Sequence, residues 1–279
     1  MEELCSRYGA LIQIWLDAGT KTPAEGGPDL LPIFRRCQPQ SVFYHSAECG
    51  EHRWIGNEAG YAGVPCWATM PDRGQTLLHG GSAAGQKLLN IGDPDGTAWS
   101  PGMVDVPLRG ANNIHNWFWS LNQGHAVQPT ETLVRMYDQS VGRNCNFVIG
   151  AGIKPDGTLP EVDARRLAEF GAQIKRRYGK PVAETKGEGE TLELLLSKPA
   201  QLDAVMIMED IARGERVRQY TIEGRAPEGD WAQLGTGQSI GHQRIQSFER
   251  QKLAAVRVRF TKSIAPPAIR RLAVFDTGG

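Results

Sequence analysis

The sequence contains no long hydrophobic run and no excess of charge of either sign. Nowhere in its 279 residues do apolar side chains approach the run of about 18 that a membrane-spanning helix needs. Lysine and arginine together number 31, as do aspartate and glutamate, so the formal net charge is zero. A nucleic-acid-binding protein needs a basic surface to neutralise phosphates. We therefore expect neither a membrane protein nor a nucleic-acid-binding protein.

The cysteines and histidines do not form the patterns of a metal or disulfide framework. No CxxC pair is present, and an odd number of cysteines cannot all pair within one chain. The histidines show neither HxH nor HxxxH spacing. We expect small thiols in or near the core and no metal site. The five cysteines are Cys5, Cys37, Cys49, Cys66 and Cys145.

The first ten residues, MEELCSRYGA, have no basic stretch followed by an apolar core. A secretory signal needs both. We therefore expect a cytoplasmic protein, whereas a start further upstream would allow a periplasmic or secreted one.

Residues 1–179 alternate helical and strand patterns, which predicts βα units around a parallel sheet. Active loops would then lie at the carboxyl ends of the strands, as in a βα barrel. Between the second strand and the third helix, residues 45–128 are expected to be mostly irregular. The expected helices cover residues 2–8, 29–37, 130–141 and 161–178, and the expected strands cover 11–16, 41–44 and 147–149.

After about residue 180 the helical period disappears, and short strands separated by turns replace it. Residues 254–261 alternate apolar and polar side chains, the pattern of a half-buried strand. A β-sandwich of about 100 residues is the natural interpretation. We expect two domains, 1–179 and 180–279, with the polar run 183–190 at their boundary. The other expected strands are 192–196, 204–208 and 217–222.

Two carboxylates stand out by their surroundings. Asp17 follows the apolar strand in Ile-Trp-Leu-Asp-Ala-Gly, and Glu58 ends the segment Arg-Trp-Ile-Gly-Asn-Glu. Two carboxylates can serve a glycosidase as nucleophile and acid/base. The alternative is equally simple: Asp17 caps a helix or lies in a loop, and Glu58 is a surface charge. Similarly, Arg143 and Asn144 precede a strand and suit either a helix cap or the floor of a barrel.

Several motifs follow one another in a recognisable order along the chain. They are Arg7 to Gly19, Arg53 to Glu58, Val104 to Val106 with Ile114 to Trp119, Ser140 to Asn146, Lys154 to Glu161, Val205 to Ile211, and Gly237 to Ile245. Together they resemble the α-L-fucosidases of glycoside hydrolase family 29, closest to the plant-like branch that prefers 1,3/1,4-linked fucose. The resemblance covers essentially the whole chain.

The resemblance implies a retaining enzyme that removes terminal α-L-fucose from fucosylated oligosaccharides or glycoconjugates. It implies Asp17 as the nucleophile and Glu58 as the general acid/base, and neither a metal nor an organic cofactor. Substrate-binding roles fall to Trp15, Trp54, Trp117 and Trp119, whose aromatic faces suit a sugar ring, and to Arg53, which would orient a hydroxyl or hold a carboxylate. The histidines that grip fucose in the family have no counterpart at matching positions, so none is transferred.

The length conflicts with a complete barrel. An eight-unit barrel needs about 250 residues, and the nucleophile lies on the first strand although the family carries it after the fourth. We therefore expect an incomplete (β/α)8 TIM-like barrel, about strands 4–8, followed by a jelly-roll-like β-sandwich. Because a half-barrel exposes a strand edge, we expect completion by a homo-oligomer, a domain swap or a different closure. The alternatives to an enzyme are a non-catalytic carbohydrate-binding protein and an inactive gene fragment.

Overall fold

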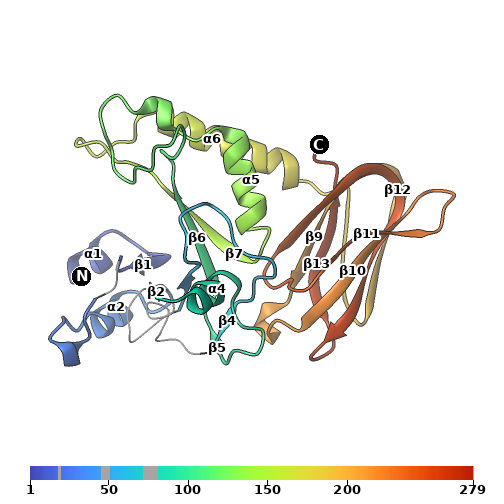
Figure 1. Cartoon of the computed structure of the whole chain (residues 1–279), viewed down its shortest axis with the longest axis horizontal. Coiled ribbons are helices and arrows are strands. Elements are labelled where there is room, and N and C mark those ends of the chain that lie inside the picture. Colours follow the sequence, from blue (N-terminus) through green and yellow to red (C-terminus); the bar gives the residue numbers. More distant parts are fainter. Residues whose placement is uncertain (18–19, 45–50, 72–80, 279) are drawn as a thin grey trace. The chain divides into compact units, whose positions relative to one another are not determined.

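The computed structural model describes residues 1–17, 20–44, 51–71 and 81–278 (Figure 1). Cys49, His45, His79 and the last two residues of the motif that contains Asp17 lie outside this description. The chain divides into two compact units, each described here by itself. The first comprises 1–56 and 67–103, and the second comprises 57–66 and 104–279.

The first unit begins with a small α/β layer. Strand β1 pairs in parallel with β2, so that Ile14 lies opposite Phe43. These two side chains form a core with Cys5 and Phe34, each at most 9% exposed. The expected βα alternation is confirmed here. The elements are α1 (Glu2–Arg7), β1 (Gln13–Trp15), the 3-10 turn η1 (Pro23–Glu25), α2 (Leu31–Cys37) and β2 (Val42–Tyr44).

The expectation that 45–128 is mostly irregular is wrong in part. A nine-residue helix and a fully buried strand lie within it, although three of the strands are only two residues long. Strand β3 pairs in parallel with the start of β6, and β4 pairs antiparallel with β5. The elements are β3 (Arg53–Trp54), β4 (Thr69–Met70), α4 (Ala83–Ile91), β5 (Ala98–Trp99), β6 (Gly102–Pro107) and η2 (Gly124–Ala126).

Two helices and a strand open the main part of the second unit. They are α5 (Thr130–Ser140), β7 (Cys145–Gly150) and α6 (Glu161–Tyr178). The prediction of helix 161–178 is confirmed at both ends. Glu161 and Asp163 lie in its first turn and Lys175, Arg176 and Arg177 in its last, an order that favours the helix dipole.

The remaining chain forms one six-stranded antiparallel sheet in the order β11-β10-β12-β9-β13-β8. The polar run 183–190, expected at a domain boundary, instead supplies edge strand β8. The division expected at residues 179 and 180 falls between α6 and β8 and stays a prediction. The elements are β8 (Ala183–Glu188), β9 (Thr191–Glu209), η3 (Ile211–Arg213), β10 (Val217–Arg225), β11 (Trp231–Gly237), β12 (Arg244–Ser263) and β13 (Ala268–Phe275).

This sheet curls because two very long strands, β9 and β12, run through both its β11-β10 side and its β13-β8 side. Strand β9 has 19 residues and β12 has 20, and their pairing shifts register at Ser247/Gln251 and at Leu253/Ala255. Such irregularities bend strands. At the second shift β9 accommodates extra residues, Pro199 among them, which explains why the sequence predicted two separate strands there. The second part of β12 continues the sheet into β10, whereas β13 pairs with the end of β9.

The curled sheet buries side chains on both faces of its β8-β13-β9 half. Along β9, Val205 and Ile207 enter a core shared with β10, β12 and β13. Ala204, Met206 and Met208 point to the opposite face, where Tyr178 of α6 packs against them. The alternation of two cores along one strand is a direct result of the two-residue strand period, and explains why the end of β9 is buried throughout.

A buried polar network joins the loops of the sheet to the start of β7. Asn144, at φ +66°, accepts a hydrogen bond from the His242 backbone N–H (2.7 Å) and donates to the Cys66 carbonyl (3.1 Å) and to Glu215. The Glu209 carboxylate accepts hydrogen bonds from three backbone N–H groups, which reduce the free-energy cost of burying it. Burial nevertheless raises the pKa of Glu209. Asn144 was expected either to cap a helix or to lie on the floor of a barrel. Its side chain does neither, because it binds His242 and Glu215 in the loops of the sheet.

His52 makes the stability of the first unit dependent on pH. Its ring is buried with its edge toward Tyr44, at 5.8 Å between ring centroids, and desolvation lowers its pKa below 6.5. The unfolded chain takes up a proton near pH 6.5 before the native chain does. The free energy of unfolding should therefore be highest above pH 6.5 and fall as the pH drops below it. Urea titrations of the wild type and of His52→Gln from pH 8 to pH 5 test this. A stability difference between the two that is constant with pH would contradict it.

Candidate active site

Glu58 lies on a segment that the second unit holds at several points. The Ala62 N–H donates to the Gln139 carbonyl at 2.9 Å, and Arg143 donates to the Ala62 carbonyl at 2.6 Å. Gly60, at φ +81°, lies so close to α5 that a Cβ there would meet a methionine side chain at 2.6 Å. Only glycine meets both demands easily. The segment is therefore fixed against α5, with the Glu58 side chain left 41% exposed.

Two ring nitrogens from one loop meet the Glu58 carboxylate. The Nε2 atom of His115 lies 2.5 Å from Glu58 Oε2, and Trp117 Nε1 donates to the same oxygen at 3.1 Å. The two rings meet edge to face, with centroids 5.9 Å apart at 82°. His115 is half exposed. The carboxylate is thus oriented by fixed donors yet open to a solute.

Two glycines, one at the end of β7 and one two residues beyond it, make room for this loop. A Cβ on Gly150 would lie 2.4 Å from the Trp117 ring, and one on Gly152 would lie 2.8 Å from the Trp119 backbone nitrogen. The absence of side chains at Gly150 and Gly152 lets the loop lie against the end of β7. Trp119, expected to bind substrate, is half-buried there.

A buried ion pair between Arg109 and Asp163 holds the same loop in place. Arg109 binds Asp163 of α6 through Nη2 (3.1 Å) and Nε (3.3 Å), with side chains 3% and 0% exposed. A third donor of Arg109, Nη1, reaches the Ser120 carbonyl at 3.0 Å. The Asn116 N–H donates to the Arg109 carbonyl at 3.0 Å. The loop that carries His115 and Trp117 is therefore bound to Arg109 at two points, Asn116 and Ser120.

Asp17 lies in the first unit, in the turn that follows β1. The Leu16 N–H donates to the Tyr44 carbonyl at 3.1 Å, which extends the parallel pairing up to the residue before Asp17. Trp15 packs against Tyr44, with ring centroids 5.6 Å apart. The Asp17 side chain is exposed at the carboxyl end of its strand, as the sequence predicts for an active loop. Its role as nucleophile stays a prediction.

Arg53 is completely buried in the first unit. Its Nε donates to the Leu89 carbonyl at 2.8 Å and its Nη1 to the Ser100 carbonyl at 2.7 Å. These contacts favour a structural role that links β3 to α4 and to the chain before β6. Trp54, next in the chain, is half-buried. Substrate binding by Arg53 and Trp54 stays a prediction.

His115 is the site residue that sequence reasoning missed. The motif around Trp117 and Trp119 was selected for its aromatic rings, and no histidine role was transferred. The signal that could have found it is its place two residues before Trp117, because residues i and i+2 of an extended segment point the same way.

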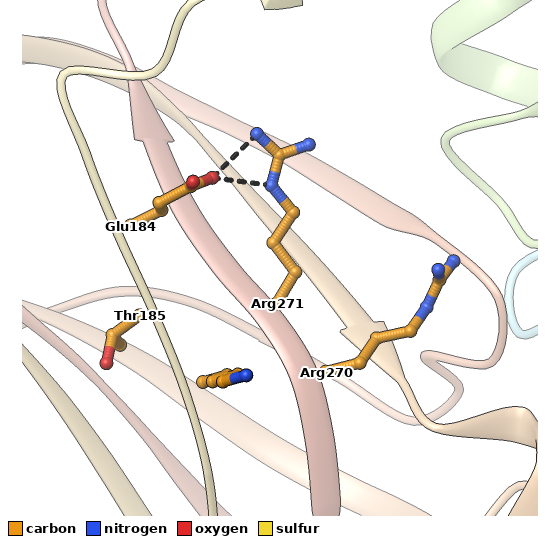
Figure 2. Close-up of a pocket in the computed structure, with 5 residues that line it drawn as sticks. Glu184, Thr185, Arg270 and Arg271 are labelled. Atoms are coloured by element: carbon orange, nitrogen blue, oxygen red, sulfur yellow. Dashed lines mark hydrogen bonds and ion pairs between the residues drawn. The ribbon is translucent and has the colours of Figure 1, made fainter.

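A separate groove of about 520 Å³ lies along the edge of the curled sheet, between β8 and β13 (Figure 2). Glu184 and Arg271 point toward one another across it and form an ion pair at 2.8 Å. Arg270 is directed elsewhere and donates to the His242 carbonyl at 3.2 Å. Because these charges largely satisfy one another and protect an edge strand, the groove lacks the converging groups of a catalytic site.

Within the described residues, no helix is long and apolar enough to cross a membrane. In that same part of the chain, no group of three or more histidine, cysteine, aspartate or glutamate side chains is arranged to hold a metal ion.

The chain is homologous to the α-L-fucosidases of glycoside hydrolase family 29. It is 26% identical to α-L-fucosidase 1 of Arabidopsis thaliana over 89% of this chain and 54% of that protein. A solved structure assigned to the α-L-fucosidases, from Bacteroides thetaiotaomicron, matches with 39% identity and a TM-score of 0.93 over 99% of this chain and 63% of that one. No family model matches the chain.

A family 29 fucosidase from Ruminococcus gnavus, solved in complex with fucose, shares the fold alone. It matches with a TM-score of 0.75 and 19% identity, over 96% of this chain and 61% of that one. The chain thus spans less than two thirds of each of these three proteins.

Proposed function

We propose that this chain is a retaining exo-α-L-fucosidase, with Glu58 as general acid/base and Asp17 as nucleophile. The observation that carries the proposal is the Glu58 carboxylate, accessible to solutes and oriented by Trp117 at 3.1 Å and His115 at 2.5 Å. Glu58 ends the motif Arg53 to Glu58, from which the family resemblance assigns it as the acid/base. The 39% identity to the Bacteroides protein supports the substrate class.

The proposed fold around this site is a partial (β/α)8 barrel, and the curled sheet folds as a two-layer sandwich. The proposal includes completion of the barrel by a second copy of the chain, by a domain swap or by a different closure. Trp54, Trp117 and Trp119 are proposed to face the apolar side of fucose. The substrate is a terminal fucose on an oligosaccharide or glycoconjugate.

The reaction is a double displacement in which every proton has a source. An oxygen of Asp17 attacks the anomeric carbon while the bond to the aglycone oxygen breaks, and Glu58 gives its proton to that oxygen. Glu58 then takes a proton from water, whose oxygen attacks the same carbon and frees Asp17. The sum is a fucoside plus water giving fucose plus an alcohol.

The proposal is tested by incubating the purified chain with p-nitrophenyl α-L-fucoside and following the sugar product by NMR. Fucose that appears first as the α anomer is expected, because two inversions restore configuration. First release of β-fucose would overturn the retaining mechanism. Saturable fucoside binding without any turnover would instead favour a carbohydrate-binding protein, and an aggregated chain with neither activity would favour an inactive fragment.

A further inference from the structure

We propose that His115 is a positioning residue that holds the Glu58 carboxylate and decides which of its oxygens carries the catalytic proton. This inference rests on the proposed function. It begins from the two contacts that converge on one atom: His115 Nε2 and Trp117 Nε1 both reach Glu58 Oε2, at 2.5 and 3.1 Å.

The chemistry fixes the direction of both hydrogen bonds. An indole N–H can only donate, so Oε2 accepts from Trp117. An ionised carboxylate has no proton to give, so His115 must carry a hydrogen on Nε2 whenever Glu58 is ionised. Within the described residues these are the hydrogen-bonding partners of Glu58. As long as His115 keeps its hydrogen on Nε2, Oε2 accepts in both contacts, and Oε1 is left as the oxygen that takes up and releases a proton.

The arrangement suits a group that alternates between acid and base. When Glu58 has given its proton to the leaving oxygen, the new negative charge is shared with Oε2, which two donors already face. Donors fixed before the charge develops need no rearrangement during the step. His115 would thereby favour loss of the proton from Oε1 and hold the carboxylate in one rotamer.

The loop is built to keep both donors in place. Trp117 rests against Gly150, where any side chain would collide with its ring at 2.4 Å. His115 meets the Trp117 ring edge to face. The partly buried hydrogen bond from Arg109 to the Ser120 carbonyl holds the loop three residues beyond Trp117. His115 reaches Glu58 from a braced loop, which separates this contact from an incidental surface pair.

The pairing is tested first without any activity. The Nε2–H proton of His115, measured by ¹H–¹⁵N NMR, should lose its downfield, hydrogen-bonded chemical shift in Glu58→Ala, because the acceptor is removed. An unchanged signal would overturn the pairing. His125, exposed on the same loop, is the internal control, and its ring signals should be alike in both proteins.

The catalytic role is tested with two fucosides that differ in leaving group, p-nitrophenol and an alkyl alcohol. His115→Ala should lower kcat/KM about tenfold more for the alkyl fucoside, which depends on the acid, than for the aryl one. His115→Gln, whose amide restores an N–H, should recover part of the loss.

The outcomes separate this inference from the proposed function. Equal losses for both fucosides, with no recovery in His115→Gln, would overturn the positioning role while leaving the fucosidase proposal intact. A wild-type chain that hydrolyses neither fucoside would overturn the proposed function and the positioning role of His115 together. The NMR comparison would still decide the pairing. His125→Ala should match the wild type in melting temperature and activity.

Discussion

Asp17→Ala should lower kcat/KM for p-nitrophenyl α-L-fucoside on the order of 10⁴-fold, because the double displacement loses its nucleophile. The side chain is exposed and follows the last residue of the β1–β2 pairing. The variant should therefore fold like the wild type, and its melting temperature checks this. Activity that survives in Asp17→Ala would show that another group is the nucleophile.

The stereochemistry of a rescued product distinguishes the two carboxylates. In Asp17→Ala, azide can take the place of the missing nucleophile, and a single inversion should give β-L-fucosyl azide. In Glu58→Ala, azide should attack the fucosyl-enzyme, and the second inversion should give α-L-fucosyl azide. Loss of the acid/base should reduce turnover by about 10²–10⁴-fold. Product of the same configuration from both variants would refute the assigned roles.

Asp163→Ala should reduce the free energy of unfolding by about 3–5 kcal/mol, because it leaves a buried guanidinium without its charge partner. Arg109 and Asp163 are 3% and 0% exposed, and both oxygens of the carboxylate are bound to the same arginine. Chemical unfolding followed by circular dichroism measures the loss. A change below about 1 kcal/mol would contradict this account of the pair.

Two further variants separate charge from packing. Glu161 lies in the same first turn of α6 and makes an exposed ion pair with Arg165 at 2.7 Å, so Glu161→Ala should cost at most about 0.5 kcal/mol. The double variant Arg109→Met/Asp163→Leu removes both buried charges and should recover most of the stability. Its fucosidase activity should stay low, since a thioether side chain has no N–H to donate to the Ser120 carbonyl.

Local sequence patterns were sufficient to predict the elements in which a regular period extends over many residues. The stripe of apolar residues predicted helix 161–178 at both ends, and alternating residues predicted the strand at 254–261 within β12. Where elements are short or buried on both sides, the period is lost. Strand β6 is buried at every position, so it lacks alternation. Edge strand β8 lacks an apolar face, which is why its charged sequence suggested a linker.

The candidate site divides in the same way. The sequence by itself selected Glu58, Trp117 and Asp17, because each stands in a motif whose order along the chain is visible without coordinates. It could not select His115, whose partner is 57 residues away, nor show that Arg53 is buried and donates to the Leu89 and Ser100 carbonyls. Those distinctions depend on which atoms meet after folding. Glycines at 150 and 152 admit the loop, a buried arginine holds it, and the meeting of two donors at one carboxylate oxygen exists only in the tertiary structure.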